Sequence, residues 1–392
     1  MPTRRERPAV VLGLDRTGLA LVRALGRAGV PVHGISWRRD DVGLKSRYLT
    51  AGVAVKGGEA NDDEALDALH RIAAGGRAVV FPAEDDWIEL ILRRWDEVRE
   101  LADLPLPDDP DVVHALRRKE RLPQTGEDGG VPSPRTVAAT SEEAIRTAEL
   151  EPPLLVKPVE GNAFQLHFDR KTFLAHTVDE AVAGWRRAHE QGFETVVQEL
   201  VPDAHERIYS LFTYVARSGA PLVSVTGRKL RQLPVDFGSS TVFETVWEPR
   251  AFELGHKLLS SVDYRGFAHV ELAHDRRDDS FKLIEVNTRP PVWVSVATGD
   301  SVDIATAAYD DLIGTPPQTE RVVADGAAWV DLVRDLLLTI ERRELRPRQF
   351  AAPYLRRRKA RALLAADDPK PVLAWVGKRV QDIGRRLAET RS

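Results

Sequence analysis

The chain has 392 residues, of which 43% are hydrophobic and 30% are charged, and its net charge is −4. This is the balance of an ordinary folded protein, and the length suggests two or three domains. The absence of cysteine excludes disulfides, thiolate metal sites and a cysteine nucleophile, and the net charge gives the whole molecule no affinity for nucleic acid.

The N-terminus is basic and leads into a short apolar run. This run is interrupted at Asp15 and Arg16, which is too early for a signal peptide. No window of the sequence holds 18 uninterrupted apolar residues, so we expect no membrane span. The default expectation is a cytoplasmic enzyme.

Residues 1–110 alternate between predicted strands and helices. Such β-α-β alternation implies a parallel sheet with helices on both faces. The predicted strands are residues 9–14, 32–36 and 78–82, and the predicted helices are residues 17–28, 62–74 and 86–101.

Two loops of this first domain carry candidate ligand-binding residues. The strand-to-helix turn at residues 13–18 could bind an anion through backbone N–H groups, but it lacks the three-glycine dinucleotide fingerprint. The acidic residues Glu84, Asp85 and Asp86 follow a strand end, where open α/β sheets place ligand sites. Helix capping by Asp85 or Asp86 explains them equally well.

Residues 111–200 are expected to form a second unit after a linker at residues 105–110. A polar loop with Gly161 and Asn162 follows one of its strands. The sequence predicts helices at 111–122 and 178–191, strands at 154–159 and 195–200, and a turn at 129–134.

Residues 201–315 begin with two predicted strands, at 207–216 and 221–226, joined by a hairpin turn at residues 217–219. A predicted helix at residues 249–261 then precedes two further short strands, which end near Glu271 and Asn287.

These last two strands hold the most informative residues of the chain. Apolar and polar residues alternate from Lys282 to Asn287, so Glu285 and Asn287 project from the same face of a strand. Glu271 closes the other run, and pairing of the two strands would gather two carboxylates and an amide oxygen. Mg²⁺ prefers such ligands. The alternative is an edge strand with ordinary solvated carboxylates, but the pattern Glu-x-Asn followed by Arg289 favours the metal site.

Residues 316–392 differ in composition and are expected to form a basic helical extension. Residues 327–344 read as an amphipathic helix that includes Trp329. Fifteen Lys and Arg residues lie between Arg342 and Ser392. This tail could pack on its own protein, which we favour, or on a partner or an anionic lipid surface as a peripheral contact.

The order of several short motifs resembles the ATP-grasp superfamily, and most strongly its carboxylate–amine ligase branch, which includes D-aspartate ligase-like proteins. The resemblance covers most of residues 8–315. The tail segment 367–371 also looks like that branch. The motifs are Lys119 ahead of Gly130-Val-Pro-Ser-Pro, Lys157 in Leu-Val-Lys-Pro, a hinge at residues 196–202, the segment 226–231, Glu271, and Glu285-Val-Asn287-Thr-Arg289.

The resemblance implies an ATP-grasp fold of mixed α/β and α+β class. Its parts would be a pre-ATP-grasp domain with a parallel sheet (1–110), a lid subdomain (111–200), a metal-binding and catalytic subdomain (201–315) and the helical tail (316–392). It also implies the cofactors ATP and Mg²⁺, with two ions expected and Mn²⁺ as an alternative. The partners would be small-molecule carboxylate and amine substrates, and a homodimer stays open.

The resemblance further assigns roles to single residues. The loop at residues 160–164 would close over the phosphates, and His269 is either a proton carrier or a packed strand residue. Arg228 and Lys229 have the alternative of a solvated basic turn. The resemblance implies that Lys119 and Lys157 bind the phosphates, that Gln198, Glu199, Leu200 and Val201 bind adenine, and that Glu206 binds ribose. It implies that the metal ligands are Glu271, Glu285 and Asn287. The implied catalytic cations are Arg289, Lys229 and Arg228.

The implied activity is ATP-dependent ligation. A substrate carboxylate would be activated as an acyl phosphate and joined to an amine, with release of ADP and phosphate. Two alternatives stay open, namely a kinase-like phosphotransferase and a nucleotide-binding regulator without catalysis.

Overall fold

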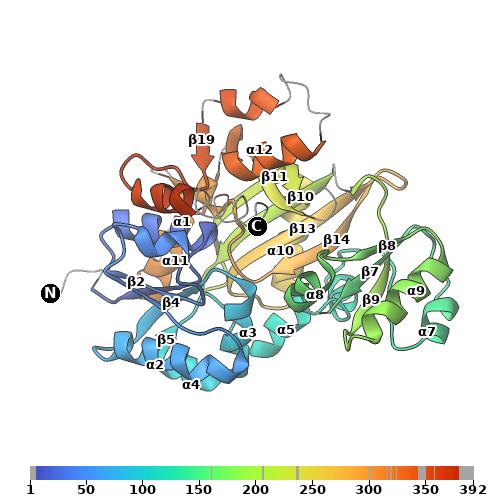
Figure 1. Ribbon diagram of the computed structural model, residues 1–392, viewed down its shortest axis with the longest axis horizontal. Coiled ribbons are helices and arrows are strands. Elements are labelled where there is room, and N and C mark those ends of the chain that lie inside the picture. The colour runs from blue at the N-terminus through green and yellow to red at the C-terminus, as the bar shows by residue number, and fades with distance from the viewer. Residues whose placement is uncertain are drawn as a thin grey trace, which may run out of the picture.

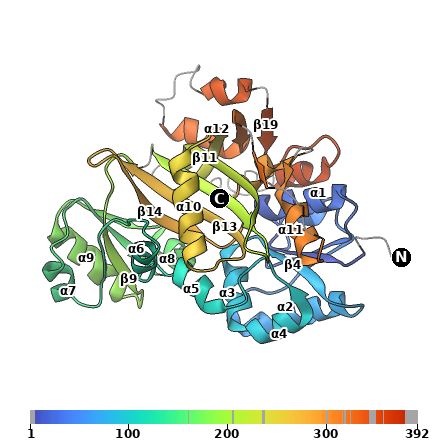
Figure 2. The ribbon, with the colours of Figure 1, turned by 180° about the vertical axis from the view of Figure 1, so that it is seen from behind.

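The computed structural model is organised around three larger sheets (Figures 1 and 2), and residues 298–299 and 302–303 form a separate sheet of two short strands. It describes residues 6–159, 161–204, 207–234, 238–299, 302–315, 317, 320–323, 325–342, 350–356 and 358–378. The N-terminal domain, the lid and the central sheet succeed one another along the chain, and the C-terminal segment returns to the N-terminal domain.

The N-terminal domain is a five-stranded parallel sheet in the order β3-β2-β1-β4-β5, as the β-α-β alternation predicts. Val11 of β1 packs on the side of α1, whereas Val10 packs on the side of α2 and α3, so the strand is buried on both faces. The elements are β1 (Ala9–Leu12), α1 (Arg16–Arg27), β2 (Val32–Ser36), β3 (Ala51–Ala54), α2 (Asp62–Ala73), β4 (Ala78–Pro82), α3 (Asp85–Arg93), α4 (Trp95–Leu101) and β5 (Ala102–Asp103).

Two helices of the sequence analysis differ in the structure. The helix expected at 86–101 is interrupted at Arg94, whose backbone leaves the helical region. The hydrophobic spacing continues across this break, from Ile91 to Trp95 and Val98, so periodicity alone gave no sign of it. The helix expected at 111–122 ends earlier, as α5 (Pro110–Arg117), and Lys119 lies in the turn before α6 (Leu122–Asp128).

The segment expected to form a lid contains a four-stranded antiparallel sheet in the order β6-β9-β7-β8, with helices packed on it, and we call it the lid by that expectation. The prediction of a polar loop at residues 160–164 is wrong, because residues 161–168 form helix α8. Phe164 and Phe168 of α8 pack into the lid core, and this burial favours the helix. The elements are β6 (Thr136–Ala138), α7 (Glu142–Thr147), β7 (Leu154–Pro158), α8 (Gly161–Phe168), β8 (Phe173–Ala175), α9 (Val178–His189) and β9 (Thr195–Glu199).

The central sheet has the order β14-β13-β10-β11-β12-β18-β19, and β17 pairs with β11. Helix α10 covers one face together with α5 and α6, and α1 and α11 cover part of the other. The elements are β10 (Ile208–Val215), β11 (Pro221–Leu233), β12 (Ser239–Thr245), α10 (Pro249–Ser261), β13 (Gly266–Asp275), β14 (Ser280–Asn287), β15 (Thr298–Gly299), β16 (Val302–Asp303), α11 (Ile304–Leu312), β17 (Arg321–Val322), β18 (Ala327–Val330), α12 (Leu332–Arg342) and β19 (Arg358–Arg361).

The helix expected at residues 327–344 is wrong in its first turn. Residues 327–330 form strand β18, which pairs with β12 on one side and β19 on the other. Trp329 is fully buried in this sheet. Strand β12 itself was not expected from the sequence.

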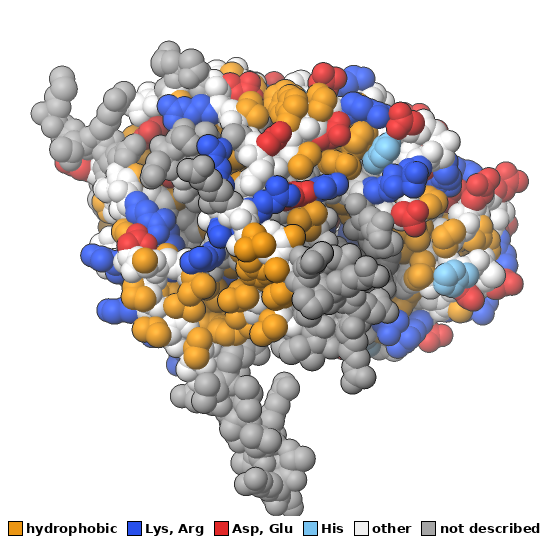
Figure 3. Space-filling view, turned by 90° about the horizontal axis from the view of Figure 1, so that it is seen from above, with side chains coloured by type: hydrophobic (Ala, Val, Ile, Leu, Met, Phe, Trp, Pro, Cys, Tyr) orange, Lys and Arg blue, Asp and Glu red, His pale blue; other side chains and the backbone are white. Residues whose placement is uncertain are grey.

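The C-terminal segment packs on the protein itself, and the helical turns that follow β19 lie beside α1 (Figure 1). The carboxylate of Asp368 is fully buried and accepts hydrogen bonds from Arg23 Nε (3.0 Å) and Ser46 Oγ (2.7 Å). Seen from above, the face of α12 and β19 shows hydrophobic side chains among Lys and Arg (Figure 3). None of the described helices is long and apolar enough to cross a membrane.

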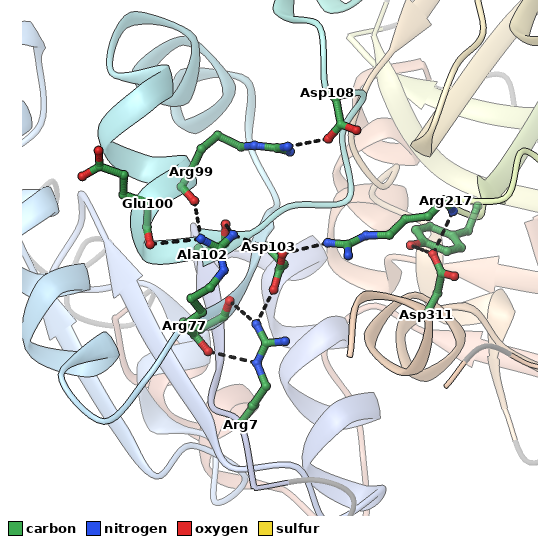
Figure 4. A network of polar contacts seen from close by, with 11 residues as sticks. Arg7, Arg77, Arg99, Glu100, Ala102, Asp103, Asp108, Arg217 and Asp311 are labelled. Carbon is green, nitrogen blue, oxygen red and sulfur yellow. Dashed lines mark hydrogen bonds and ion pairs between the residues drawn. The ribbon is translucent and has the colours of Figure 1, made fainter. Parts of the chain in front are cut away.

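A second polar network joins the N-terminal domain to the central sheet (Figure 4). Asp103 of β5 accepts hydrogen bonds from Arg7, Arg77 (3.1 Å) and Arg217 (2.7 Å). Arg217 lies in the turn between β10 and β11, and its backbone N–H donates to Asp311 of α11 (3.0 Å). The edge of the N-terminal sheet is therefore attached to the central domain through one carboxylate.

Candidate active site

Strands β13 and β14 pair antiparallel and place Glu271 directly opposite Glu285, and His269 opposite Asn287. Directly opposite residues of a sheet project from the same face, and so do residues two apart on one strand. The pairing expected from the sequence therefore gathers Glu271, Glu285 and Asn287 on one face. Glu271 is buried, whereas Glu285 is exposed.

The three candidate metal ligands suit Mg²⁺ in part. Glu285 and Asn287 have no side-chain hydrogen bond or ion pair among the described residues, so their oxygens are available. In the described ranges, no three His, Cys, Asp or Glu side chains form a metal site by themselves. Two carboxylates and an amide would thus hold an ion only together with phosphate or water oxygens, as Mg²⁺ sites commonly do.

Lys229 and Arg228 lie on opposite faces of β11. Lys229 Nζ is 3.2 Å from Glu271 Oε1 and belongs to the site. Arg228 instead pairs with Glu244 (2.7 Å), away from Glu271 and Glu285. The alternative of a solvated basic turn is wrong for both, because they lie inside a paired strand.

Lys119 and Lys157 line one cavity between the lid and β14. Lys119 Nζ donates to Pro158 O (2.7 Å), and Lys157 Nζ donates to Gln198 Oε1 (2.6 Å). Leu283 and Ile284, which directly precede Glu285, line the same cavity. The two lysines therefore line a cavity that borders the strand of Glu285.

The charges of this cleft act on one another. Burial and the nearby Lys119 lower the pKa of Lys157 to about 8, although Glu285 and Glu271 act in the opposite direction. Burial also lowers the pKa of Lys119, and Glu285 and Asp85 partly offset this effect. A cleft that destabilises its own ammonium groups favours a bound polyanion.

The hinge residues divide between two faces of β9. Gln198 points toward the cleft, where it holds Lys157. Glu199 accepts from the backbone N–H of Glu151 (2.9 Å) on the other face. The backbone N–H of Leu200 donates to Pro153 O (2.9 Å) and is therefore already satisfied.

Two further residues complete the expected nucleotide ligands. Val201 is buried next to the hinge, and its carbonyl accepts from Ala204 N (3.2 Å). Glu206, the expected ribose ligand, lies outside the described residues.

Arg289 is held by the N-terminal domain. Its Nη2 donates to Asp85, which also accepts from Arg117 Nη1 (2.8 Å). Burial opposes the charge of Asp85, but the two arginines outweigh it and hold the pKa of this carboxyl well below its usual range. Asp85 makes no capping hydrogen bond at the start of α3, so the capping interpretation is wrong for this residue.

His269 packs next to the candidate metal ligands. Its Nε2 is 3.2 Å from Ser210 Oγ, and its ring meets Trp293 edge to face at 5.3 Å. Burial lowers the pKa of His269 to about 4, so the ring is neutral near pH 7. This environment agrees with the packing interpretation.

The sequence analysis missed two charged residues near the candidate site, Arg117 and Lys171, and did not predict the pairing of Asp85 with arginines. Asp85 and Arg117 pair beside Arg289, and the charges of Glu285 and Glu271 raise the pKa of Lys171, which burial lowers. Asp85 was noted only as part of an acidic cluster. No local motif marks Arg117 or Lys171.

The chain was compared with known proteins. No protein-family model matches it. A D-aspartate ligase from Enterococcus faecium (strain Aus0004) is 22% identical over 275 residues, which cover 66% of this chain and 65% of that protein. The chain thus spans just under two thirds of the length of this curated relative.

Solved structures of similar fold include a synthetase, a carboxylase and a ligase. An ADP complex of N5-carboxyaminoimidazole ribonucleotide synthetase is 14% identical, with a TM-score of 0.65 and 86% of each chain covered. A biotin carboxylase–β-γ-ATP complex from Campylobacter jejuni is 14% identical, with a TM-score of 0.65. The match covers 84% of this chain and 75% of that chain. An L-amino acid ligase from Bacillus licheniformis is 14% identical, with a TM-score of 0.63. The match covers 83% of this chain and 79% of that chain.

At these identities the solved structures establish the fold. They confirm the ATP-grasp fold expected from the sequence, and the curated relative shows that part of the chain is similar in sequence to a D-aspartate ligase.

Proposed function

We propose that the protein is an ATP-dependent ligase that joins a small-molecule carboxylate to an amine. One observation carries the proposal, namely that Glu271 and Glu285 lie opposite one another on β13 and β14 and act electrostatically on Lys157, which lines one cavity with Lys119. Phosphoryl transfer depends mainly on positioning and charge neutralisation, and this cleft offers groups for both. The sequence likeness to a D-aspartate ligase supports the same reaction class.

In the first step, a substrate carboxylate oxygen attacks the γ-phosphorus of ATP, and the bond to the β-phosphate oxygen breaks. Lys119 and Lys157 neutralise the nucleotide phosphates as point charges. Glu285, Glu271 and Asn287 would hold Mg²⁺, which supplies further neutralisation of the phosphate charge. We propose that these residues would hold two ions together with phosphate oxygens, and that Mn²⁺ would be able to replace Mg²⁺.

In the second step, the amine attacks the carbonyl carbon of the acyl phosphate. The C–N bond forms, the C–O bond to phosphate breaks, phosphate leaves, and the amine proton passes to solvent. Lys229 can stabilise the oxyanion that develops on the carbonyl. Arg289, fixed by Asp85, offers its remaining N–H groups to the transferred phosphoryl group, since its Nε is buried and has no partner among the described atoms.

The test is a screen of amino acids and small acids in pairs for ATP-dependent phosphate release, with mass spectrometry of the products. We expect phosphate and an amide only when acid, amine, ATP and Mg²⁺ are all present. ADP release that needs no amine would instead indicate a phosphotransferase. Turnover that survives complete chelation of divalent metal would contradict the metal assignment.

A matched pair of variants tests the key carboxylate. Glu285→Gln should abolish turnover without loss of stability, because the side chain is exposed and unpaired within the described structure. Glu253→Gln, on the exposed face of α10, should leave both turnover and melting temperature unchanged. Near-normal turnover of Glu285→Gln would remove this residue from the metal site.

A further inference from the structure

The C-terminal part of the chain leaves apolar side chains exposed on the outside of the molecule. Of the eleven large hydrophobic residues that are exposed in the described parts of the chain, six lie in residues 332–376. Figures 1 and 2 place α12, β19 and the turns that follow β19 together along the upper edge of the molecule, and Figure 3 shows hydrophobic side chains gathered on that side. The six are Leu332, Leu336, Leu355 (80% exposed), Leu364, Leu373 (66% exposed) and Val376. Exposed apolar patches of this kind mark interaction sites.

The helix at residues 370–378 is apolar on two sides. Trp375 packs on the hydrophobic cluster that includes α1, so this side holds the helix to the protein. Leu373 and Val376 are exposed, and with Lys370 they follow one another at steps of three residues, which places them on another side of the same helix. Attachment of the helix to the protein therefore does not account for Leu373 and Val376.

The same part of the chain is basic and offers almost no exposed acid. Residues 350–378 contain two acids, of which Asp368 is buried and Asp367 pairs with Arg27. Four exposed cations in this range make no ion pair with any described residue, namely Arg358, Lys359 and Arg361 of β19 and Lys370 of the helix. We call the six exposed apolar residues and these four cations the C-terminal surface.

Apolar side chains among unpaired cations suit an anionic lipid surface. The apolar groups can enter the boundary between head groups and acyl chains, and the cations are attracted by the lipid charge. A second copy of the chain fits less well, because a two-fold interface would bring the same cations opposite one another. A polyanion without an apolar part would pair with the cations but leave the leucines in water.

We propose that the C-terminal surface docks on a membrane that contains anionic lipid. The contact is peripheral, and it goes beyond the proposed ligase function without depending on it. The residues of the C-terminal surface are exposed in the structure as it stands, so docking needs no conformational change.

Co-sedimentation of the full chain with vesicles tests the proposal. We expect the wild type to bind vesicles of equal parts phosphatidylcholine and phosphatidylglycerol at least about tenfold more tightly than vesicles of phosphatidylcholine, and to lose affinity as salt is raised. Lys370→Glu and Leu373→Ser should each weaken binding to the anionic vesicles by about fivefold or more, the first through charge and the second through apolar contact. Both side chains are exposed, so neither variant should change the melting temperature.

Matched control variants lie on other parts of the surface. Arg71 of α2 is exposed and makes no ion pair with any described residue, and Leu166 of α8 is exposed as well. We expect Arg71→Glu and Leu166→Ser to bind vesicles as the wild type does. A wild type that sediments with neither kind of vesicle, or Lys370 and Leu373 variants that bind as tightly as the wild type, would overturn the inference. A dimer that Leu373→Ser dissociates in sedimentation velocity, without vesicle binding, would assign the surface to a second copy and overturn it as well.

Discussion

Lys157 lies in surroundings that oppose its own charge. Burial and Lys119 together lower its pKa to about 8, and the attraction of Glu285 and Glu271 does not compensate. Near pH 8 about half of the Lys157 side chains are therefore neutral in the free protein. A bound polyphosphate would add negative charge next to Lys157 and raise its pKa again.

This shift predicts proton uptake when nucleotide binds. At pH 8 we expect Mg-ATP binding to take up about half a proton at Lys157, and affinity should fall as the pH rises above 8, because only the cationic form attracts phosphate. At pH 6.5 the uptake at Lys157 should vanish, since the lysine is already protonated. Calorimetry in buffers of different ionisation enthalpy measures this uptake.

Lys157→Arg is the control for this prediction. Arginine stays charged throughout this range, so the variant should bind nucleotide with much less uptake at pH 8. Uptake equal to that of the wild type would show that another group titrates.

The candidate site was predictable where its residues lie in local motifs. Glu285 and Asn287 are two apart on a strand, and Lys157 ends a short apolar run, so the printed sequence shows each of them. Asp85 and Arg289 are 204 residues apart, and only the docking of the N-terminal domain brings them together. Lys171 belongs to no motif either, and Ser239, which it contacts, is 68 residues away in the sequence.

At the scale of elements, tertiary contacts decided where the local pattern was ambiguous. Residues 161–168 read as a polar loop, yet Phe164 and Phe168 are four apart and pack together into the lid core. Residues 327–330 read as the start of a helix because Trp329 and Leu332 continue the helical spacing. Pairing with β12 and β19 makes them a strand, and these partners are distant in sequence. By contrast, the helix expected at 249–261 is confirmed as α10.

The packing of α8 predicts how the lid responds to truncation. Phe164 is fully buried and contacts Phe168, Phe173 and Phe193, so Phe164→Ala should destabilise the lid by about 3–5 kcal/mol. Leu166 lies on the same helix but is 88% exposed, and Leu166→Ala should change stability by less than about 0.5 kcal/mol.

Hydrogen exchange of the amides in β7 and β9 measures this difference, because it reports the stability of the lid separately from that of the other units. Equal protection in the two variants would show that α8 is not anchored by Phe164.

At the scale of the whole molecule, two polar networks fasten the N-terminal domain to the rest of the chain. The network of Asp103 joins β5 to the turn between β10 and β11 (Figure 4). Although burial acts in the opposite direction, its arginine partners lower the pKa of Asp103 to about 2, so the charged carboxylate is stabilised in the fold. Asp85 and Arg289 join the same domain to the cleft. The cleft is thus completed from two domains, and its geometry depends on how they dock.

The C-terminal segment attaches the N-terminal domain to the central sheet at a further place. It leaves the central sheet at β19 and places Asp368 against α1, where Arg23 Nη2 also donates to the carbonyls of Leu363 and Asp368 (both 2.9 Å). Both members of the Arg23–Asp368 pair are buried, so removal of one leaves an uncompensated charge. The tail therefore contributes to folding through one buried carboxylate as well as through its basic residues.

Two adjacent aspartates allow a direct test of this role. Asp368→Ala should lower the free energy of unfolding by about 3–5 kcal/mol, because Arg23 stays buried without its partner. Asp367→Ala should cost no more than about 1 kcal/mol, since its pair with Arg27 is 43% exposed on the aspartate side and screened by water. Denaturant unfolding of both variants measures the difference, and the Asp367 variant controls for general effects on the tail. If both variants lost little and equal free energy of unfolding, the tail would be dispensable for docking of the N-terminal domain. Nucleotide affinity would then be expected to survive removal of the tail.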